Sequence, residues 1–420
     1  MKTLIKNCKI VNHDNITESG ILIDGGNISA ITNEGNADKV IDAKGAYALP
    51  GLIDMHVHMR DPGLEYKEDI ESASKAASAG GITSLCCMAN TKPVIDNAVV
   101  VNYVVSKAKT LGMIDVFPYG AVTKGMKGEE LTEFSDMLNS GAGGFSDDGK
   151  TIMNSEVMRR ALEYARQFDT FIASHAIDIN LEGGGVMHEG AVSAANGLKG
   201  IPSEAEAVIT IRDILLAKLT NSRVHICHVS AKEAVDLIRW GKEQGIKVTA
   251  EATPHHFTLT DKCCENYDTN CKMSPPLREE EDIEAIINGL KDGTIDCIAT
   301  DHAPHQADEK FVEFNYAPVG ITGLQTLIPL TLNLIRAGRL TWTDFARTAS
   351  YNPAKILGKN NLGIIAPNMQ ADITIIDPDD EYVFDEKVNL SKSVNSPFWN
   401  KTLKGRAIYT IKNGKIVFSL

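Results

Sequence analysis

The sequence has 420 residues, of which 43% are hydrophobic and 23% are charged, and its formal net charge is −13. This composition is ordinary for a globular protein with one large domain and a smaller one. The acidic balance argues against nucleic acid or an anionic membrane surface as the main partner, but it allows a local positive pocket for an acidic small molecule.

The start of the sequence predicts a cytoplasmic protein. Residues 1–10 carry charges every few positions and lack the apolar core of a signal peptide, and no stretch is long and apolar enough to span a membrane. The 8 cysteines contain no Cys-x-x-Cys pair. We expect reduced, buried thiols where cysteines fall in apolar strand-like runs, namely at Cys86, Cys87, Cys227 and Cys297. The cluster of Cys263, Cys264 and Cys271 lacks zinc-site spacing.

Strand-like segments lie near both ends of the chain. In the first fifty residues they are 3–11, 21–31 and 39–49, with a hairpin turn at Asp24-Gly25-Gly26-Asn27. Near the other end they are 371–376 and 406–418, with a second turn at Asn413-Gly414. Neither set has enough apolar surface to bury a core alone. We therefore expect residues 1–50 and 359–420 to form one small β-sandwich domain, with the middle of the chain inserted between its halves.

The middle, residues 51–358, alternates strand and helix patterns. Its eight predicted strands are 51–58, 81–89, 115–122, 142–147, 170–175, 223–229, 247–253 and 296–300. Helix patterns between them are 67–78, 97–110, 129–139, 155–167, 204–219, 231–244 and 279–291. Eight such units predict a TIM (β/α)8 barrel, so the fold class is α/β. An open doubly wound sheet is the alternative, but no Gly-x-Gly-x-x-Gly follows a strand.

Two histidines interrupt the first of these strands. His56 and His58 point to the same side because side chains alternate along a strand, which places them about 7 Å apart. Asp54 and Arg60 share that side. A lone histidine is more often a satisfied core residue, but this pair stands at the end of an apolar strand and just before a loop. That position favours a metal site.

Polar residues also follow most of the other strands, at the edge where barrel active sites form. They are Asn90, Asp147, Asp148, His175, His228, Asp301, His302 and His305. A single carboxylate after a strand is often only a helix cap, but together these residues indicate a metal or catalytic centre. Imidazole and carboxylate ligands without thiolate favour Zn²⁺, with Mn²⁺ or Co²⁺ as substitutes.

Eight spaced motifs resemble those of the metal-dependent amidohydrolases, and within them the dihydroorotases of the bacterial type I class. They are His56-Val-His-Met-Arg-Asp-Pro-Gly63, Met88-Ala-Asn-Thr-Lys-Pro93, Phe145-Ser-Asp-Asp-Gly149, Ser174-His175, Cys227-His-Val-Ser230, Glu251-Ala-Thr-Pro-His-His256, Met273-Ser-Pro-Pro-Leu-Arg278 and Thr300-Asp-His-Ala-Pro-His305. The resemblance covers essentially the whole chain, including the divided β domain.

The resemblance implies two Zn²⁺ ions per subunit, the more buried one bound by His56, His58 and Asp301, the second by His175 and His228, and both bridged by Asp148. It implies substrate contacts from His58, Arg60, Asn90, Ser274 and His305, and from the backbone near Val319 and Gly320. Many relatives have Asn where this sequence has Ser274. The shorter hydroxyl would reach the substrate through a water molecule.

The implied reaction is the reversible closure of N-carbamoyl-L-aspartate to L-dihydroorotate and water, the third step of pyrimidine synthesis. Two divalent ions can share a hydroxide near neutral pH and polarise a carbonyl oxygen. Asp301 is placed to carry a proton between that hydroxide and the amide nitrogen. A carboxylate on the substrate explains an Arg60, Asn90 and His305 group beside the metals.

Two other functions stay open at this point. One is a dihydropyrimidinase, hydantoinase or allantoinase, which as a family bridge their metals with a carboxylated lysine; here Asp148 fills that place and Lys150 lies two residues further. The other is an inactive dihydroorotase-like partner of aspartate transcarbamoylase, which would have lost ligands. We expect a homodimer, with association with aspartate transcarbamoylase as a further expectation.

Several polar or loop-like residues have simpler interpretations. His255 and His256 point oppositely if they lie on a strand, so we expect a core or supporting role. His225 differs in parity from His228 and is predicted to face the helices. The segment 306–318 is predicted to be a loop that folds over the barrel mouth as a lid.

Overall fold

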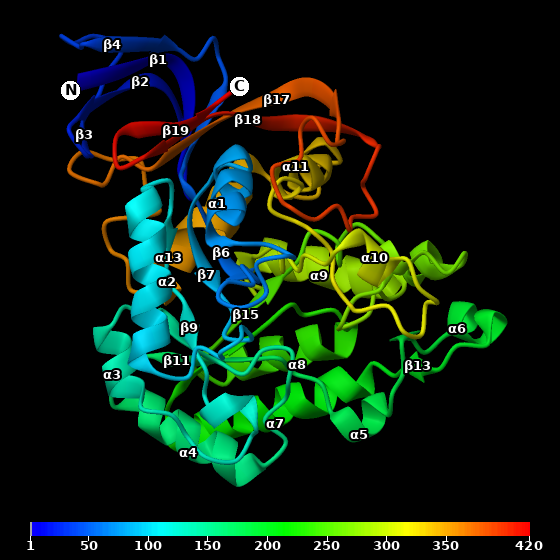
Figure 1. Ribbon diagram of the computed structural model, residues 1–420. Helices are drawn as coiled ribbons and strands as arrows, with labels where there is room; N and C mark the ends of the chain where they lie inside the picture. The colour runs from blue at the N-terminus through cyan, green and yellow to red at the C-terminus, as the bar shows by residue number, and fades with distance from the viewer. Residues whose placement is uncertain (1) are drawn as a thin grey trace.

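The computed structural model describes residues 2–420, and its central strands close into a parallel barrel (Figure 1). The strands in order are β6 (Leu52–Val57), β7 (Ile82–Cys87), β8 (Asp115–Val116), β9 (Tyr119–Gly120), β10 (Gly144–Ser146), β11 (Phe171–Ser174), β14 (Arg223–Ile226), β15 (Val248–Ala252) and β16 (Cys297–Ile298). Strand β8 pairs with β7 and β9 pairs with β10, so these two short strands, separated by Pro118, fill one barrel position. The backbone N–H of His58 donates to the carbonyl of His302 at 2.8 Å and closes the ring. The barrel prediction is confirmed, and the open-sheet alternative is wrong.

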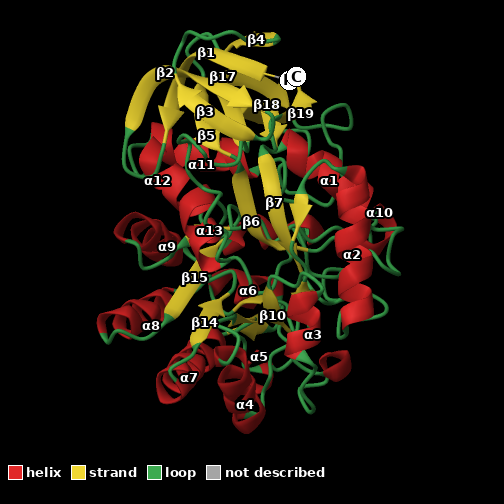
Figure 2. Cartoon of the chain, turned by 90° about the vertical axis from the view of Figure 1, so that its left-hand side faces the viewer, coloured by secondary structure: helices red, strands yellow, loops and turns green. Residues whose placement is uncertain are grey.

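Helices surround the barrel as its outer layer (Figure 2). The eight that follow the barrel strands are α1 (Ile70–Ala79), α2 (Ala98–Leu111), α3 (Phe134–Asn139), α4 (Ser155–Arg166), α7 (Glu204–Thr220), α8 (Lys232–Glu243), α9 (Glu280–Asp292) and α11 (Leu327–Arg336). Most begin and end within a few residues of the predicted bounds. Elements that the pattern did not predict are α5 (Ile179–Glu182), β12 (Met187–His188), α6 (Ala191–Asn196), β13 (Gly200–Ile201), α10 (Ala307–Lys310), α12 (Trp342–Ala346) and α13 (Asn352–Ile356).

Local capping explains where several helices begin and end. The side chain of Asn97 accepts hydrogen bonds from the backbone of the first turn of α2, and Asn154 does the same for α4. At the other end, α2 stops at Gly112 with φ +65° and α9 at Gly293 with φ +83°. Only glycine adopts that left-handed backbone without steric cost, so these two residues end their helices.

The two terminal segments form one β domain, as predicted, but its strands belong to a single sheet rather than to the predicted β-sandwich. Its strands are β1 (Lys2–Val11), β2 (Ile16–Asp24), β3 (Asn27–Ile31), β4 (Lys39–Asp42), β5 (Tyr47–Pro50), β17 (Ile373–Val383), β18 (Thr402–Lys412) and β19 (Lys415–Ser419). They form one continuous sheet in the order β19-β18-β17-β5-β1-β2-β3, with β4 also paired to β1. The blue strands β1 to β4 and the orange and red strands β17 to β19 gather at the top of Figure 1, and β5 joins the two sets by pairing antiparallel with β17. A separate isoleucine core fills this domain.

Two polar contacts fix the terminal segments. The side-chain amide of Asn12 accepts from the backbone N–H of Ile365 at 2.8 Å and donates to its carbonyl at 3.1 Å. Lys412 of β18 is buried and lies 2.7 Å from Asp372 and 2.6 Å from Asp115 of barrel strand β8. Lys412 therefore neutralises two carboxylates at the junction of the β domain and the barrel.

Cysteine chemistry is largely as predicted. Cys86, Cys87, Cys227 and Cys297 are free and buried, which confirms the prediction for them. Cys263 and Cys271, which the sequence left without a role, are joined by a disulfide. Among residues 2–420, no helix is long and apolar enough to cross a membrane.

Lys412→Met should destabilise the protein markedly, because it leaves the buried Asp372 carboxylate without its cation. Breaking such a buried pair costs about 3–5 kcal/mol. Urea unfolding followed by circular dichroism should show the loss as a lower midpoint. The control is Lys404→Met in the same strand, where the side chain is 38% exposed beside Asp379 and should contribute less than about 1 kcal/mol. Equal midpoints for the two variants would contradict this account of the junction.

Candidate active site

The six residues predicted to bind metal lie together at the carboxyl end of the barrel strands. They come from five barrel positions: His56 and His58 at the end of β6, Asp148 after β10, His175 after β11, His228 after β14 and Asp301 after β16. All are buried except His175, which is partly exposed. The fold therefore brings to one place the six side chains that the family resemblance implied.

Asp148 lies between two pairs of histidines. Its Oδ2 atom is 3.4 Å from His56 Nε2 and 3.5 Å from His58 Nε2. Its Oδ1 atom is 3.3 Å from His228 Nε2 and 3.4 Å from His175 Nδ1. One carboxylate oxygen thus faces each pair, as a bridging ligand would.

Asp301 lies closest to the first of these pairs. Its Oδ1 atom lies 3.0 Å from His58 Nε2 and 3.4 Å from His56 Nε2. Burial would lower the pKa of His56, but the carboxylates of Asp148 and Asp301 raise it well above its usual value. The group therefore attracts positive charge, as a cation site must.

The donor atoms fit a divalent metal ion. His56 Nε2 is buried and has no hydrogen-bond partner, although a buried imidazole nitrogen normally has one. Two groups whose ligand atoms lie within 4.8 Å of one another share His228: one adds His56 and Asp301, and the other adds Asp148 and His175. Imidazole nitrogen and carboxylate oxygen are ligands that zinc prefers.

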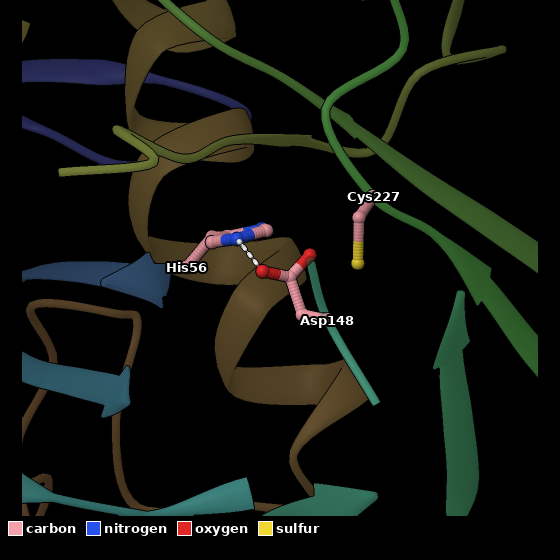
Figure 3. Close-up of side chains that lie close together, drawn as sticks. All are labelled: His56, Asp148 and Cys227. Atoms are coloured by element: carbon pink, nitrogen blue, oxygen red, sulfur yellow. Dashed lines mark ion pairs between the residues drawn. The ribbon is translucent and has the colours of Figure 1, made fainter. Parts of the chain in front are cut away.

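A third such group contains a cysteine. Figure 3 shows the His56 ring directed at the Asp148 carboxylate, with the Cys227 thiol nearby. Burial raises the pKa of Cys227, which favours the neutral thiol over the thiolate that binds metals. Cys227 packs in the barrel interior with Phe171, so we assign it to the core.

Glu251, on β15, orients the first histidine of this site. Its carboxylate accepts from His56 Nδ1 at 2.6 Å and from His225 Nε2 at 3.1 Å. Burial would raise the pKa of Glu251, but the two neighbouring imidazoles lower it to about 2, so the carboxylate is ionised. The proton of His56 is thereby held on Nδ1, and its Nε2 is free for a metal. The signal for this role in the sequence is a single glutamate within an otherwise uncharged, buried strand.

The prediction that His225 faces the helices is wrong. His225 is fully buried in the barrel interior, where it contacts Glu251 and Phe171. Parity along the strand failed because β14 ends at Ile226 and His228 has φ +34°, outside the strand conformation. Alternation of side chains holds only while the backbone stays extended.

Asp147 explains why its neighbour Asp148 points into the barrel. The Asp147 carboxylate accepts from the backbone N–H groups of Val122 at 2.8 Å and Thr123 at 3.1 Å, and from the Thr123 hydroxyl. The hydroxyl of Ser146 accepts from the backbone N–H of Asp148 at 3.1 Å. These contacts anchor the turn to the segment that follows the neighbouring strand β9.

A cavity of about 410 Å³ opens above the six residues. From the predicted substrate set it is lined by His58, Arg60, Asn90, Ser274, His305 and Val319. Gly320 is not among its lining residues. Its N–H donates to the carbonyl of Lys272 at 3.0 Å and its carbonyl accepts from Asn395 at 3.0 Å, so both of its polar groups are already used.

The two ends of the cavity differ in charge. The two aspartates make one end acidic, and Arg60 makes the other end basic. At the basic end, the guanidinium of Arg60 lies 3.3 Å from His305 Nε2. Asn90 connects the ends, because its Oδ1 atom accepts from His58 Nδ1 at 3.0 Å and so holds the His58 proton away from Asp301. Burial, with the nearby Arg60 charge, lowers the pKa of His305 to about 2, so this imidazole is neutral.

Asn395, between β17 and β18, joins two walls of the cavity. Its side chain accepts from the backbone N–H of His305 at 2.9 Å and donates to the carbonyls of Ala303 and Gly320, each at 3.0 Å. Nothing in the sequence pattern around Asn395 indicated this role, because it is one polar residue in an irregular segment.

Of the remaining buried histidines near the mouth, His256 and His302 have partners on both ring nitrogens, whereas Nε2 of His255 has none. His256 Nδ1 lies 2.8 Å from the Thr253 hydroxyl and Nε2 lies 2.9 Å from the carbonyl of Pro275, which confirms a supporting role. His255 is also buried. His302 Nδ1 accepts from the backbone N–H of Gly323 at 3.1 Å and Nε2 lies 3.3 Å from Glu68.

Comparisons with known proteins identify relatives of this chain. A family model described as dihydro-orotase-like matches residues 45–234. The sequence is 49% identical over 427 residues to a dihydroorotase of Trichlorobacter lovleyi, with 100% of both chains covered. It is 53% identical over 380 residues to a dihydroorotase of Geobacter metallireducens, covering 90% of this chain and 89% of the other. The solved L-hydantoinase (dihydropyrimidinase) from Arthrobacter aurescens matches with TM-score 0.89 and 26% identity, covering 99% of this chain and 96% of that one.

Glu251→Gln should weaken metal binding by about 10- to 100-fold, the usual effect of removing a group that orients a metal ligand. A glutamine has one acceptor oxygen for two imidazole N–H donors, and its NH₂ group would face one of them. Zinc titration of the metal-free protein against a chelator measures the change. Glu281→Gln, at a side chain 67% exposed on α9, is the matched control and should bind as the parent does. Parental affinity in Glu251→Gln would show that His56 does not depend on this contact.

Proposed function

The chain belongs to the dihydroorotase family, and on that premise we propose that it closes N-carbamoyl-L-aspartate to L-dihydroorotate and opens the ring in reverse. The observation that carries this proposal is the polarity of the cavity. Three of the four clustered histidines and both aspartates line one end, and Arg60 and His305 line the other end of the same cavity of about 410 Å³. A cyclic amide at the first end and a carboxylate at the second match that arrangement.

We propose two zinc ions as the cofactor. His56, His58 and Asp301 would hold one ion, His175 and His228 the other, and Asp148 both, because each of its oxygens faces one histidine pair. When bound, such ions lower the pKa of water and polarise a carbonyl oxygen. The buried Glu251 and Asn90 contribute by fixing which nitrogen of His56 and His58 is available.

Asp301 is the proposed proton carrier. In hydrolysis a water oxygen bonds to the ring carbonyl carbon, the carbon–nitrogen bond breaks, and the water proton must reach the departing nitrogen. The Asp301 carboxylate lines the cavity and lies beside His58, where it can accept that proton and deliver it. In ring closure the same carboxylate starts protonated and runs the transfer backwards.

The basic end would bind the substrate carboxylate. The Arg60 guanidinium can form two parallel hydrogen bonds to a carboxylate, and the neutral His305 and the Asn90 amide add further donors. Ser274 lines the same cavity. Its short hydroxyl would contact the substrate through a water.

A hydantoinase-like activity is the second candidate, because a solved L-hydantoinase shares the fold at TM-score 0.89. Dihydroorotase and hydantoinase differ in the bridging group. Here the carboxylate of Asp148 already stands between the histidine pairs, and the ammonium of Lys150 donates instead to the carbonyl of Met126 at 3.3 Å. This geometry favours the dihydroorotase reaction.

Turnover assays on zinc-reconstituted protein test the proposal directly. N-carbamoyl-L-aspartate and L-dihydroorotate should interconvert, whereas dihydrouracil, hydantoin and allantoin, which lack the ring carboxylate, should react far more slowly. If dihydrouracil, hydantoin or allantoin were hydrolysed faster than dihydroorotate, the hydantoinase-like activity would be the function instead.

Asp148→Ala should lose metal and activity, whereas Lys150→Ala should keep most of both, because Asp148 alone lies between the two histidine pairs. Removal of bicarbonate during reconstitution should have no effect. Metal analysis and turnover under both conditions provide the measurement. Bicarbonate-dependent activity that disappears in Lys150→Ala would assign the bridge to a carboxylated lysine.

Arg60→Met should lower kcat/KM for dihydroorotate by an amount equivalent to about 2–5 kcal/mol, the cost of removing one partner of a buried charge pair. Arg160→Met, at a side chain 69% exposed on α4, is the control and should behave as the parent. Steady-state kinetics in both directions measure the effect. An unchanged kcat/KM would mean that another group holds the carboxylate.

A further inference from the structure

We propose that Lys67 is a positioning residue that fixes the ring tautomer of His305 and so makes His305 Nε2 a hydrogen-bond donor for the substrate carboxylate. The proposal rests on the proposed function, since it concerns the basic end of the same cavity. Lys67 does not line that cavity, so its effect would pass through His305.

The side chain of Lys67 is held between two partners. Its Nζ atom lies 3.1 Å from His305 Nδ1 and 2.7 Å from Glu309 Oε1, and the side chain is only 12% exposed. The backbone is fixed as well, because the Ser393 hydroxyl donates to the carbonyl of Lys67 at 2.7 Å. The ammonium group is therefore directed at His305 by its surroundings.

The chemistry of the partners determines where His305 carries its proton. An ammonium group has three donors and no acceptor, so His305 Nδ1 must offer its lone pair to Lys67. On the other side of the ring, Nε2 lies 2.9 Å from the carbonyl oxygen of Val319, which can only accept. Both contacts require the same tautomer, with the proton on Nε2.

This tautomer suits carboxylate binding at Arg60. The Arg60 guanidinium lies 3.3 Å from His305 Nε2, and since both groups are donors they do not bond to each other. The guanidinium therefore stays available to an anionic ligand, and the single Nε2–H, which donates to the Val319 carbonyl, can be shared with that ligand in a three-centre hydrogen bond. If the proton moved to Nδ1, the lone pair on Nε2 would accept from Arg60 and repel the carboxylate.

Glu309 makes Lys67 necessary. Its Oε2 atom lies 3.6 Å from His305 Nδ1, and a carboxylate acceptor there would favour the opposite tautomer. Lys67 occupies the space between them and reverses that preference. Removal of Lys67 should therefore weaken substrate binding, and additional removal of Glu309 should restore part of it.

Nitrogen NMR of histidine-labelled protein without substrate tests the tautomer, with the His305 signals identified by their loss in His305→Asn. The parent and Lys67→Arg, which keeps a donor-only side chain, should show the proton on Nε2. Lys67→Met should shift it toward Nδ1, and Lys67→Met with Glu309→Gln should shift it part of the way back. A proton on Nδ1 in the parent, or no change in Lys67→Met, would overturn the proposal.

Kinetics test the consequence for the substrate. Lys67→Met should raise KM for dihydroorotate by about 10- to 100-fold, as expected for the loss of one hydrogen bond to a charged group, while kcat changes little. Lys67→Arg should stay near the parent, and the double variant should recover part of the loss. Lys75→Met, at an exposed lysine of α1 paired with Glu71, is the control and should have no effect.

The two measurements separate the possible failures. A purely structural role for Lys67 would lower thermal stability and kcat without moving the proton of His305, and that result would overturn the proposal. If the tautomers behave as described but the parent does not turn over dihydroorotate, the proposed function fails and the role of the Nε2 donor fails with it.

Discussion

The structure depends on the balance of charge at the barrel mouth. Asp148 and Asp301 are buried beside four imidazoles, and burial of an ionised carboxylate is costly unless a positive charge compensates it. The nearby histidines supply that charge only when they take up protons, whereas a divalent cation supplies it while leaving them neutral ligands. Metal binding is thus the arrangement in which these buried groups keep the charge states that suit their surroundings.

Several polar residues around this centre hold a metal-site histidine in one tautomer or a turn in one conformation. Glu251 leaves one nitrogen of His56 free, Asn90 does the same for His58, and Asp147 fixes the turn that directs Asp148 inward. None of these three contacts needs the substrate. The site is consequently preorganised, so little conformational freedom is lost when substrate binds.

Sequence periodicity was enough to predict the barrel, the divided β domain and the strand ends that carry polar residues, whereas the resemblance to known motifs selected the six clustered residues among them. These features depend on local rules: alternation along strands, helix periodicity and the common edge at which parallel strands end. The rules failed where the backbone leaves regular geometry. Parity misplaced His225 because the strand ends before His228, and the elements between β11 and α7 are too short to show a period.

Contacts between residues far apart in the sequence could not be predicted either. Asn395 bonds to His305 and Gly320, yet nothing near it in the sequence indicates which backbone groups it would meet. Glu68 similarly accepts from the hydroxyl of Ser391. Such partners are determined by the packing of the C-terminal segment over the barrel. The proposed roles of the individual site residues depend on these contacts as much as on the motifs.

The pairing of β5 with β17 has a consequence for how the protein is made. On a ribosome, β5 emerges long before its partner β17, and Asn12 likewise meets Ile365 across 353 residues of sequence. Until then β5 exposes an unpaired edge, which invites association with other chains. The barrel can begin to assemble in the meantime, because each of its units pairs with the next along the chain. Synthesis therefore leaves the edge of β5 without its partner until the C-terminal segment emerges, and this interval is when a chaperone would matter most.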